Sequence, residues 1–320
     1  MIGLVTALQV VLPVALLLWL GLFALPGAFG IAVQAAGVGA FLLALALVAQ
    51  WAVVPWWLPR VHGVLWVGIV FWHVLRGHMG EWAVLPSGAM QWTGLLAAVV
   101  LLASGAWYAT AALRGRTLPP GRVIDIANPF AKGAYLVGSG GSNALINAHV
   151  RTLDPTIARY EPWRGQSYAV DFFGLNTWGT RAEGLRPTAP EAYAIFGATL
   201  TAPCAGRIEA TENAMPDFQV PEQDTVNRLG NHVLLRCGDA LIVLAHMRQG
   251  SIEVTPGQKV AMGDPLGQVG NSGASTEPHL HVHAQRPAAE GAPPISGEPL
   301  AMRIEGRFLV RGDRLTGSEG

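Results

Sequence analysis

The strongest constraint on this 320-residue chain is the uneven distribution of its charged side chains. Charged residues make up 13% of the chain, against about 25% in an ordinary soluble protein. Residues 1–116 carry five of the 42 charged residues, namely Arg60, Arg76, Glu81, Arg114 and Arg116. A single soluble domain is therefore excluded. We predict an α-helical membrane domain in the first third and a water-soluble domain after it.

Four apolar stretches of membrane-crossing length follow one another in this first third. A helix needs about 20 predominantly apolar residues to cross the hydrocarbon core. We expect about four such helices, at Ile2–Leu25, Ile31–Val54, Trp57–Leu75 and Trp92–Leu113, with three as the alternative. No Lys or Arg precedes the first stretch, and it is longer than the apolar run of a cleaved signal peptide, so we interpret it as an uncleaved anchor.

The composition after the last predicted span divides the rest of the chain. Residues 117–136 contain Pro119-Pro120-Gly121 and are predicted to be a linker. Residues 137–315 are predicted to form a mainly antiparallel β domain, and residues 316–320 a short tail. The proposed domains are therefore 1–116, 117–136, 137–315 and 316–320.

Short runs rich in β-branched and aromatic residues indicate the strands of this domain. Ala144–Val150 and Ser167–Phe173 are two such runs. The clearest hairpin joins His232–Cys237 to Ala240–His246 through a two-residue turn. The alternating run Met302–Val310 is predicted to be a closing strand. No convincing amphipathic helix is found in this region, so the domain is predicted to be mostly β.

Three histidines alternate with apolar residues in His279-Leu280-His281-Val282-His283. On a strand, residues two apart lie on the same face, so the three imidazoles would point the same way. Imidazole is the commonest metal ligand in proteins, and nitrogen and oxygen donors suit Zn²⁺. Together with His246, which ends a predicted strand, this pattern predicts a zinc site.

The stretch Gly-Asn-Ser-Gly-Ala-Ser-Thr-Glu-Pro-His-Leu-His at residues 270–281 resembles the C-terminal signature of the M23, or lysostaphin/LytM-like, zinc metallopeptidases. The resemblance extends back over roughly residues 137–290, through 260–267, His246, 230–233 and 202–206. It implies a LytM/M23-type antiparallel β fold, here fused to a multi-span membrane domain. It also implies hydrolysis of peptide bonds in peptidoglycan stems or cross-bridges.

The resemblance assigns roles to individual residues. Asp171 and His281 become zinc ligands, and His246 and His279 become catalytic groups beside the metal. A catalytic zinc keeps three protein ligands and an open position for water. One nearby histidine can then act as general base, and a second can hold the developing oxyanion.

The first metal ligand departs from the family pattern. The family usually has a histidine four residues before the aspartate, where this chain has Ser167. His149 is the first substitute: if the strands 144–150 and 167–173 pair antiparallel, its end lies beside the vacant position, and a divergent subset of the family has an upstream histidine. His283, on the face of His281, is the alternative third ligand. A noncatalytic domain that binds cell wall or regulates another hydrolase is the alternative function.

The chain has two cysteines, Cys204 and Cys237, without the C-x-x-C spacing of a metal or redox site. If residues 206–211 and 231–237 are antiparallel neighbours, the thiols meet and form a disulfide, which persists mainly in oxidising compartments. This favours a multi-pass protein of the bacterial cytoplasmic membrane with its C-terminal domain on the periplasmic side. Basic residues after the last predicted span argue weakly for the opposite side.

The expected partners follow from the two domains. The membrane domain would contact the lipid bilayer, and the β domain would bind peptidoglycan peptides or another peptide substrate. The formal net charge is zero, so no global field argues for nucleic acid.

Overall fold

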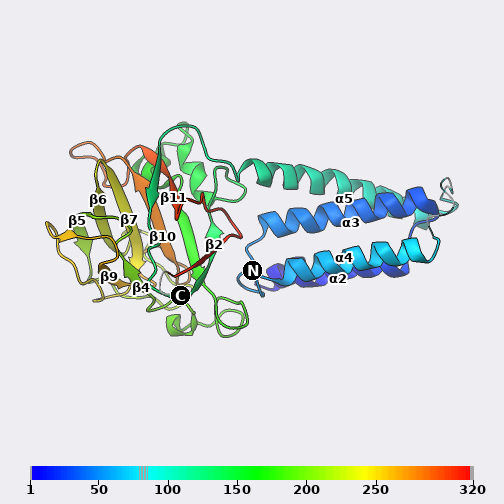
Figure 1. Cartoon of the computed structure of the whole chain (residues 1–320), viewed down its shortest axis with the longest axis horizontal. Coiled ribbons are helices and arrows are strands. Elements are labelled where there is room, and N and C mark those ends of the chain that lie inside the picture. The colour runs from blue at the N-terminus through cyan, green and yellow to red at the C-terminus, as the bar shows by residue number, and fades with distance from the viewer. Residues whose placement is uncertain (1, 79, 81, 83, 85, 318–320) are drawn as a thin grey trace. The chain divides into compact units, whose positions relative to one another are not determined.

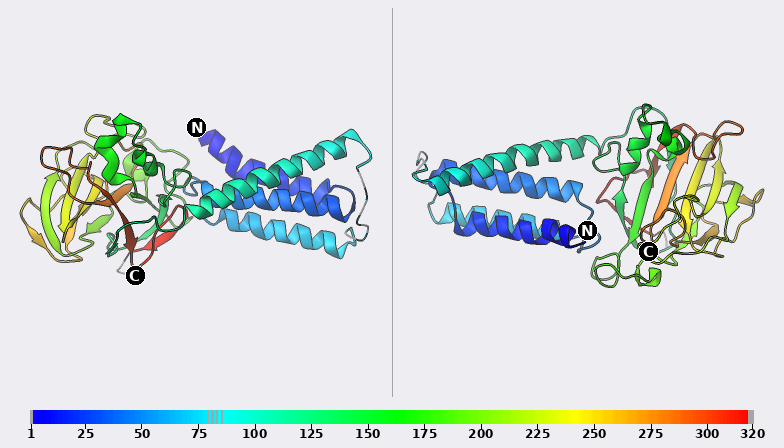
Figure 2. Two further views of the ribbon diagram at one scale, coloured as in Figure 1. Left: turned by 90° about the horizontal axis from the view of Figure 1, so that it is seen from above. Right: turned by 180° about the vertical axis from the view of Figure 1, so that it is seen from behind.

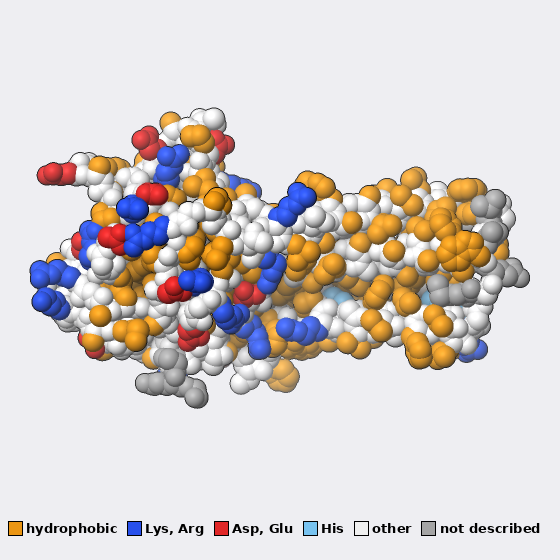
Figure 3. Space-filling model, turned by 45° about the horizontal axis from the view of Figure 1, so that its top comes forward, with side chains coloured by type: hydrophobic (Ala, Val, Ile, Leu, Met, Phe, Trp, Pro, Cys, Tyr) orange, Lys and Arg blue, Asp and Glu red, His pale blue; other side chains and the backbone are white. Residues whose placement is uncertain are grey.

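The computed structural model describes residues 2–78, 80, 82, 84 and 86–317, and the chain divides into two compact units between Leu113 and Arg114. The first unit is helical, and every strand in the described part of the chain belongs to the second (Figure 1). Figure 3 shows hydrophobic side chains covering much of the helical unit, with the charged groups mostly on the sheet unit. The predicted fold class is therefore confirmed. Of the five charged residues in the first third, Glu81 lies outside the described residues.

Four helical segments of the first unit are long and apolar enough to cross a membrane. The first is continuous through α1, a π-helical turn η1 and α2. The π turn ends two residues before Pro13, whose nitrogen has no hydrogen to donate. The elements are α1 (Ile2–Thr6), η1 (Ala7–Val11), α2 (Leu12–Leu22), α3 (Gly27–Val48), α4 (Leu58–Leu75) and α5 (Ala89–Arg114).

Glycines allow close packing between α3 and α5. A Cβ atom on Gly37 would lie 2.4 Å from the carbonyl oxygen of Ala98, and one on Gly105 would lie 2.5 Å from the carbonyl carbon of Ala40. Such contacts between small residues are typical of helices that pack within membranes. Larger side chains would separate the two helices at these points.

Ten of the twelve strands in the described part of the second unit form one sheet. Its main path runs β12-β2-β3-β10-β7-β6-β5-β8, β1 pairs with β11 in parallel, and β11 also joins β10. Figure 2 shows the strands of this unit in two further views. A separate two-stranded sheet pairs β4 with β9. The strands are β1 (Val123–Ile126), β2 (Ala134–Ser139), β3 (Val170–Gly174), β4 (Thr199–Thr201), β5 (Gly206–Glu212), β6 (Asn231–Cys237), β7 (Ala240–Met247), β8 (Lys259–Val260), β9 (Pro265–Gln268), β10 (Leu280–Gln285), β11 (Pro299–Ile304) and β12 (Arg314–Thr316).

The central strands present different side chains to the two sides of the sheet. Leu280, Val282 and Ala284 of β10 belong to the main hydrophobic core of the unit. The alternate residues His281 and His283 face the other way, as the strand period of two requires. Short 3₁₀ helices also occur in this unit: η2 (Ala148–Leu153), η3 (Ala158–Gln166) and η4 (Pro190–Ala192).

Three local predictions are corrected by the structure. Ala144–Val150 is not a strand, because Asn147 caps a 3₁₀ helix at this point: its side chain accepts a hydrogen bond from the backbone nitrogen of His149. The expected linker 117–136 contains β1, whose edge is completed by β11 from the far end of the chain. The expected strand Met302–Val310 is real as far as Ile304 and then turns at Glu305, which has a φ of 52°.

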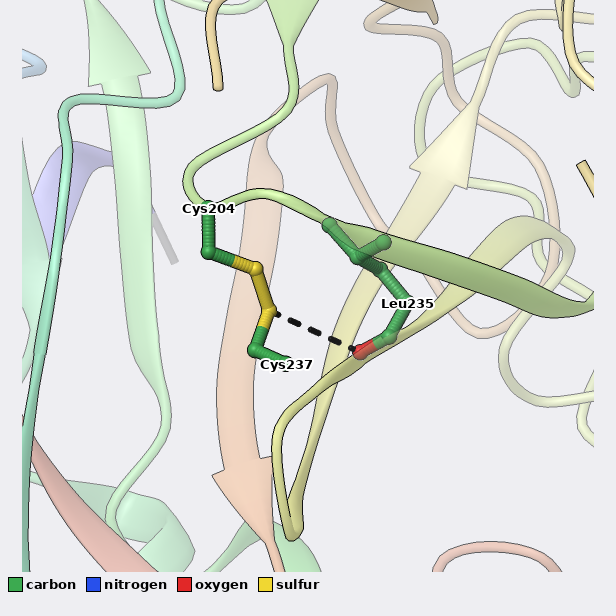
Figure 4. Close-up of a disulfide and its surroundings, with 3 residues drawn as sticks. All are labelled: Cys204, Leu235 and Cys237. Carbon is green, nitrogen blue, oxygen red and sulfur yellow. Dashed lines mark hydrogen bonds between the residues drawn. A yellow bond between two sulfur atoms is a disulfide. The ribbon is translucent and has the colours of Figure 1, made fainter. Parts of the chain in front are cut away.

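Cys204 and Cys237 form a disulfide in the structure (Figure 4). Strands β5 and β6 pair antiparallel, with Arg207 opposite Arg236, and this register places the two cysteines next to each other. Their Cα atoms are 6.1 Å apart. The bridge joins the segment before β5 to the end of β6.

Candidate active site

Three neighbouring strands position the first two groups of the site. Asp171 lies in β3 directly opposite His281 of β10, and His281 lies opposite Ala245 of β7. Residues facing each other across antiparallel strands have Cβ atoms about 4.5–5.5 Å apart. The sheet register therefore brings the carboxylate and the imidazole into contact, and His281 Nδ1 lies 3.0 Å from Asp171 Oδ1.

His149 reaches the same carboxylate from η2, and not from a strand. Its Nε2 atom is 2.9 Å from Asp171 Oδ2. The buried Asn147 side chain holds the start of η2 by donating to the carbonyl oxygens of Gly141 and Ala169. The position of His149 thus depends on a local cap and two backbone contacts.

Ser167 does not line the cavity that these groups share. It is fully buried, donates through Oγ to the carbonyl oxygen of Arg164, and contacts Thr152 Oγ1 at 2.8 Å. Thr152 in turn donates to the carbonyl oxygen of His149. Ser167 therefore helps to hold η2, which carries His149, against η3.

His149, Asp171 and His281 form a compact donor set. Each offers one ligand atom, and the three atoms lie within 4.8 Å of one another. Zn–N and Zn–O bonds of about 2.0–2.2 Å in a tetrahedral site require ligand atoms roughly 3.3 Å apart, close to the separations of 2.9 and 3.0 Å found here. Two nitrogen donors and one carboxylate thus fit a zinc site with a remaining position for solvent.

His283 does not join this set. Its Nδ1 atom lies 2.9 Å from His281 Nε2, on the side of that ring away from Asp171. The structure therefore gives no support to His283 as the third ligand, and places it behind a ligand instead.

His246 and His279 lie beside the donor set, with their rings 4.7 Å apart. His246 Nδ1 donates to the carbonyl oxygen of Ser272 at 2.9 Å, and His279 Nδ1 donates to that of Glu277 at 2.9 Å. In both rings this leaves Nε2 available; His279 Nε2 is 4.0 Å from Asp171 Oδ1.

The backbone turns His246 toward the site. Strict alternation along β7 would place it with Ile242 and Leu244 in the core. Its φ of 63° departs from strand geometry, and its ring lines the cavity with the donor set. Non-glycine residues with a positive φ are strained, and they cluster at functional sites.

Burial and neighbouring charges determine the protonation of these groups. Burial raises the pKa of the Asp171 carboxyl, but His149, His281 and His279 outweigh this and hold it well below its usual range. Burial lowers the pKa of His246 well below its usual value, and the neighbouring His279 and His281 add to this. Burial also lowers the pKa of His281, against the opposing effect of Asp171. At neutral pH the site therefore holds an ionised carboxylate and neutral His246 and His281.

A cavity of about 210 Å³ opens over the five residues His149, Asp171, His246, His279 and His281. Its remaining wall is formed by Trp163, Gln166, Arg228, Leu229 and Ala274. A second cavity of about 470 Å³ shares three of these wall residues, Trp163, Arg228 and Leu229.

Sequence reasoning missed Trp163 and Arg228. The Arg228 guanidinium lies 5.0 Å from the centre of the Trp163 ring, and no carboxylate in the described part of the chain pairs with it. Trp163 lies in the short 3₁₀ helix η3 and Arg228 in the turn before β6, and no spacing pattern of the sequence links them to the site.

The chain is similar over part of its length to a cell division protein and to solved peptidases. The cell division protein DipM of Caulobacter vibrioides is 31% identical over 120 residues, which are 38% of this chain and 17% of DipM. The chain therefore spans about a sixth of the length of this relative.

Among solved structures, the catalytic domain of lysostaphin from Staphylococcus simulans is 23% identical, with 38% of this chain and 69% of that chain covered, at a TM-score of 0.25. A zinc-containing peptidase from Vibrio cholerae is 17% identical, with 48% of this chain and 29% of that chain covered, at a TM-score of 0.24. Residues 192–293, which lie in the sheet unit, match the model of Peptidase family M23.

Proposed function

We propose that this protein is a membrane-anchored zinc metallopeptidase that hydrolyses peptide bonds of peptidoglycan stems or cross-bridges. The observation that carries the proposal is the convergence of His149, Asp171 and His281 beside two histidines whose Nε2 atoms are available. The match to Peptidase family M23 supports the reaction class. The similarity to a cell division protein supports the cell wall as the place of action.

His149 Nε2, His281 Nδ1 and an oxygen of Asp171 would hold the zinc ion. Such an ion supplies activation of water and polarisation of the scissile carbonyl. The two imidazoles are neutral donors when unprotonated, and the ionised Asp171 contributes the negative charge that offsets the cation. His149 therefore replaces the histidine that the family usually has four residues before the aspartate.

His246 is placed to act as the general base. Donation of its Nδ1–H to Ser272 fixes the tautomer in which Nε2 carries the lone pair. Its lowered pKa keeps the ring neutral, so Nε2 can accept a proton from the attacking water at neutral pH. His279, which lines the same cavity and has Nε2 on the side of Asp171, is the group proposed to stabilise the developing oxyanion.

The cavity wall suits a peptide substrate that carries a carboxylate. Trp163 offers an apolar ring, and Arg228 offers a cation that the chain itself leaves without a carboxylate partner among the described residues. The second cavity continues past the same two residues, which gives room for peptide beyond the scissile bond.

The membrane location and the side of the membrane are part of the proposal. Four apolar helices of sufficient length support an anchor in the bilayer. The Cys204–Cys237 disulfide supports an oxidising compartment, because the cytoplasm keeps thiols reduced. We therefore propose that the sheet unit lies on the periplasmic side of a bacterial cytoplasmic membrane.

The test measures zinc content and peptide release together on the full chain purified in detergent. We expect one zinc per chain in the wild type and release of peptides from purified peptidoglycan, with both lost in His149→Ala and in His281→Ala. Zinc retained in His149→Ala would reject that residue as a ligand.

A noncatalytic regulator is the second candidate, favoured by Ser167 at the family's ligand position. A wild-type chain that binds peptidoglycan but releases no peptide with zinc supplied would support it. That result would reject the peptidase proposal.

A further inference from the structure

Strand β10 continues its polar face beyond the proposed metal ligand. His281, His283 and Gln285 lie two residues apart on the same side of the strand, and His279 precedes them with the same spacing. His283 and Gln285 are both fully buried. Neither has a role in the reaction described above, and burying two such polar groups is costly unless they are hydrogen-bonded.

The Gln285 amide, at the end of this polar face, has a fixed hydrogen-bond direction. Gln285 Nε2 lies 2.6 Å from the carbonyl oxygen of Pro294. A carbonyl oxygen can only accept, so the amide must present its NH₂ group to Pro294 and its Oε1 atom elsewhere. The orientation of the Gln285 amide is thus determined by backbone outside β10.

His283 is the neighbour that can use Gln285 Oε1. Within the described residues, His283 Nε2 and Gln285 Oε1 are both buried and neither has a hydrogen-bond partner. They belong to residues two apart on the same face of β10, so the two unpartnered atoms lie on the same side of the strand. If the two atoms pair, Oε1 can only accept, so His283 carries its hydrogen on Nε2 and leaves Nδ1 as an acceptor.

His283 in turn determines which nitrogen of the proposed metal ligand His281 carries the hydrogen. His283 Nδ1 lies 2.9 Å from His281 Nε2, so an accepting Nδ1 requires the hydrogen of His281 to be on Nε2. His281 Nδ1 is then bare and faces Asp171 Oδ1 at 3.0 Å. Two acceptors at this distance repel each other unless a cation lies between or beside them.

We propose that His283 and Gln285 are positioning residues that hold His281 in the tautomer able to bind zinc through Nδ1. The relay runs from the Pro294 carbonyl oxygen through Gln285 and His283 to His281. This relay rests on the proposed function, because holding a zinc ligand is its role. Partners of metal-binding histidines orient the ring and fix its tautomer, and their loss typically weakens metal binding about 10–100-fold.

Gly165 of η3 provides the space for the relay. A Cβ atom at this position would lie 1.6 Å from Gln285 Oε1 and 2.7 Å from the carbonyl oxygen of Ile295. The backbone nitrogen of Gly165 also donates to that Ile295 oxygen, so the segment cannot move away without losing this bond. Gly165→Ala therefore displaces the Gln285 amide without removing any polar group of the site.

Zinc affinity of the full chain in detergent, measured by competition with a chelator, is the first readout. Gln285→Leu, His283→Leu and Gly165→Ala should each bind zinc about 10–100-fold more weakly than the wild type. His283→Gln keeps an acceptor for His281 and should restore affinity to within about threefold of the wild type. Val282→Ala, on the core face of the same strand, is the control for lost stability and should leave zinc affinity unchanged.

The tautomer itself is the second readout, and it does not depend on zinc. Long-range ¹H–¹⁵N spectra of the metal-free chain labelled on histidine should show His283 with its hydrogen on Nε2. In Gln285→Leu, which removes the acceptor, that hydrogen should shift toward Nδ1 of His283.

Two outcomes separate the relay from the function on which it rests. An unchanged His283 tautomer and a zinc affinity within twofold of the wild type in Gln285→Leu would overturn the relay alone. A wild-type chain that binds no zinc would overturn the proposed function, while the tautomer spectra would still decide whether the relay exists.

Discussion

The helical unit and the sheet unit bury polar side chains in different ways. In the helical unit, Gln34 accepts from the backbone nitrogen of Leu25, and His73 Nε2 donates to the carbonyl oxygen of Leu20. In the sheet unit, Asp171 and His281 contact each other, and their cavity is open to solvent. A side chain satisfied by backbone contributes to packing. Side chains that converge on one point leave lone pairs for chemistry, and the proposed activity therefore belongs to the sheet unit.

Among the substitutions that test this comparison, Asp171→Asn should have the largest effect on zinc binding and peptide release. The substitution removes the negative charge that offsets a divalent cation, while its amide keeps nearly the same shape. We expect loss of bound zinc and a fall in peptide release of about 1,000-fold, since a catalytic metal contributes several kcal/mol. Metal analysis and a peptidoglycan digestion assay measure the two effects.

The matched control is Asp154→Asn, which changes an exposed carboxylate at the end of η2. It should retain zinc and activity. Full activity in Asp171→Asn would show that the convergence of polar groups in the sheet unit serves structure only, as in the helical unit.

His246→Gln should separate zinc binding from proton transfer. The variant loses the proposed general base but none of the three proposed ligands, so zinc content should stay at the wild-type level. We expect kcat to fall about 10²–10⁴-fold, the usual contribution of such a base. A coupled loss of zinc would instead make His246 part of the metal site.

Arg228→Gln should have a smaller effect, confined to substrate binding. A hydrogen bond to a charged group contributes about 1.5–3 kcal/mol, so we expect KM for a carboxylate-bearing peptide to rise about tenfold, with kcat within twofold. The same peptide with its carboxylate amidated should show no difference between wild type and variant. Equal losses on both peptides would remove Arg228 from substrate recognition.

Gly105→Leu tests the helical unit and should have the smallest effect on chemistry. The new side chain would enter the backbone of α3 near Ala40, and overpacking of this kind costs about 1–3 kcal/mol. We expect tryptophan fluorescence to report a lower unfolding temperature in detergent, with hydrolysis of soluble muropeptides within twofold of the wild type. Gly63→Leu is the control, because nothing lies within 4 Å of a Cβ at that position. A large loss of hydrolysis in Gly105→Leu would show that the two units are coupled.

Local patterns were sufficient for the class of each unit and for part of the site. Long apolar stretches predict helices whatever their surroundings, because in a bilayer each backbone group must bond within its own segment. The alternation of His279, His281 and His283 placed these rings on one face, and extending it by two residues would have included Gln285.

Contacts between distant segments decided the remaining features. His149 was selected for the wrong local reason, since a cap at Asn147 replaces the expected strand. His246 is turned to the cavity by a backbone φ that alternation cannot indicate.

The amino-acid sequence by itself determined which side chains were available for the chemistry and on which face of β10 they lie, because the period of a strand is a local property. The tertiary structure decided that His149 meets Asp171, 22 residues away, and that Asp171 meets His281, 110 residues away. Those contacts depend on how η2 is capped and on the register of β3 against β10. None of these is encoded in the spacing of the residues they bring together.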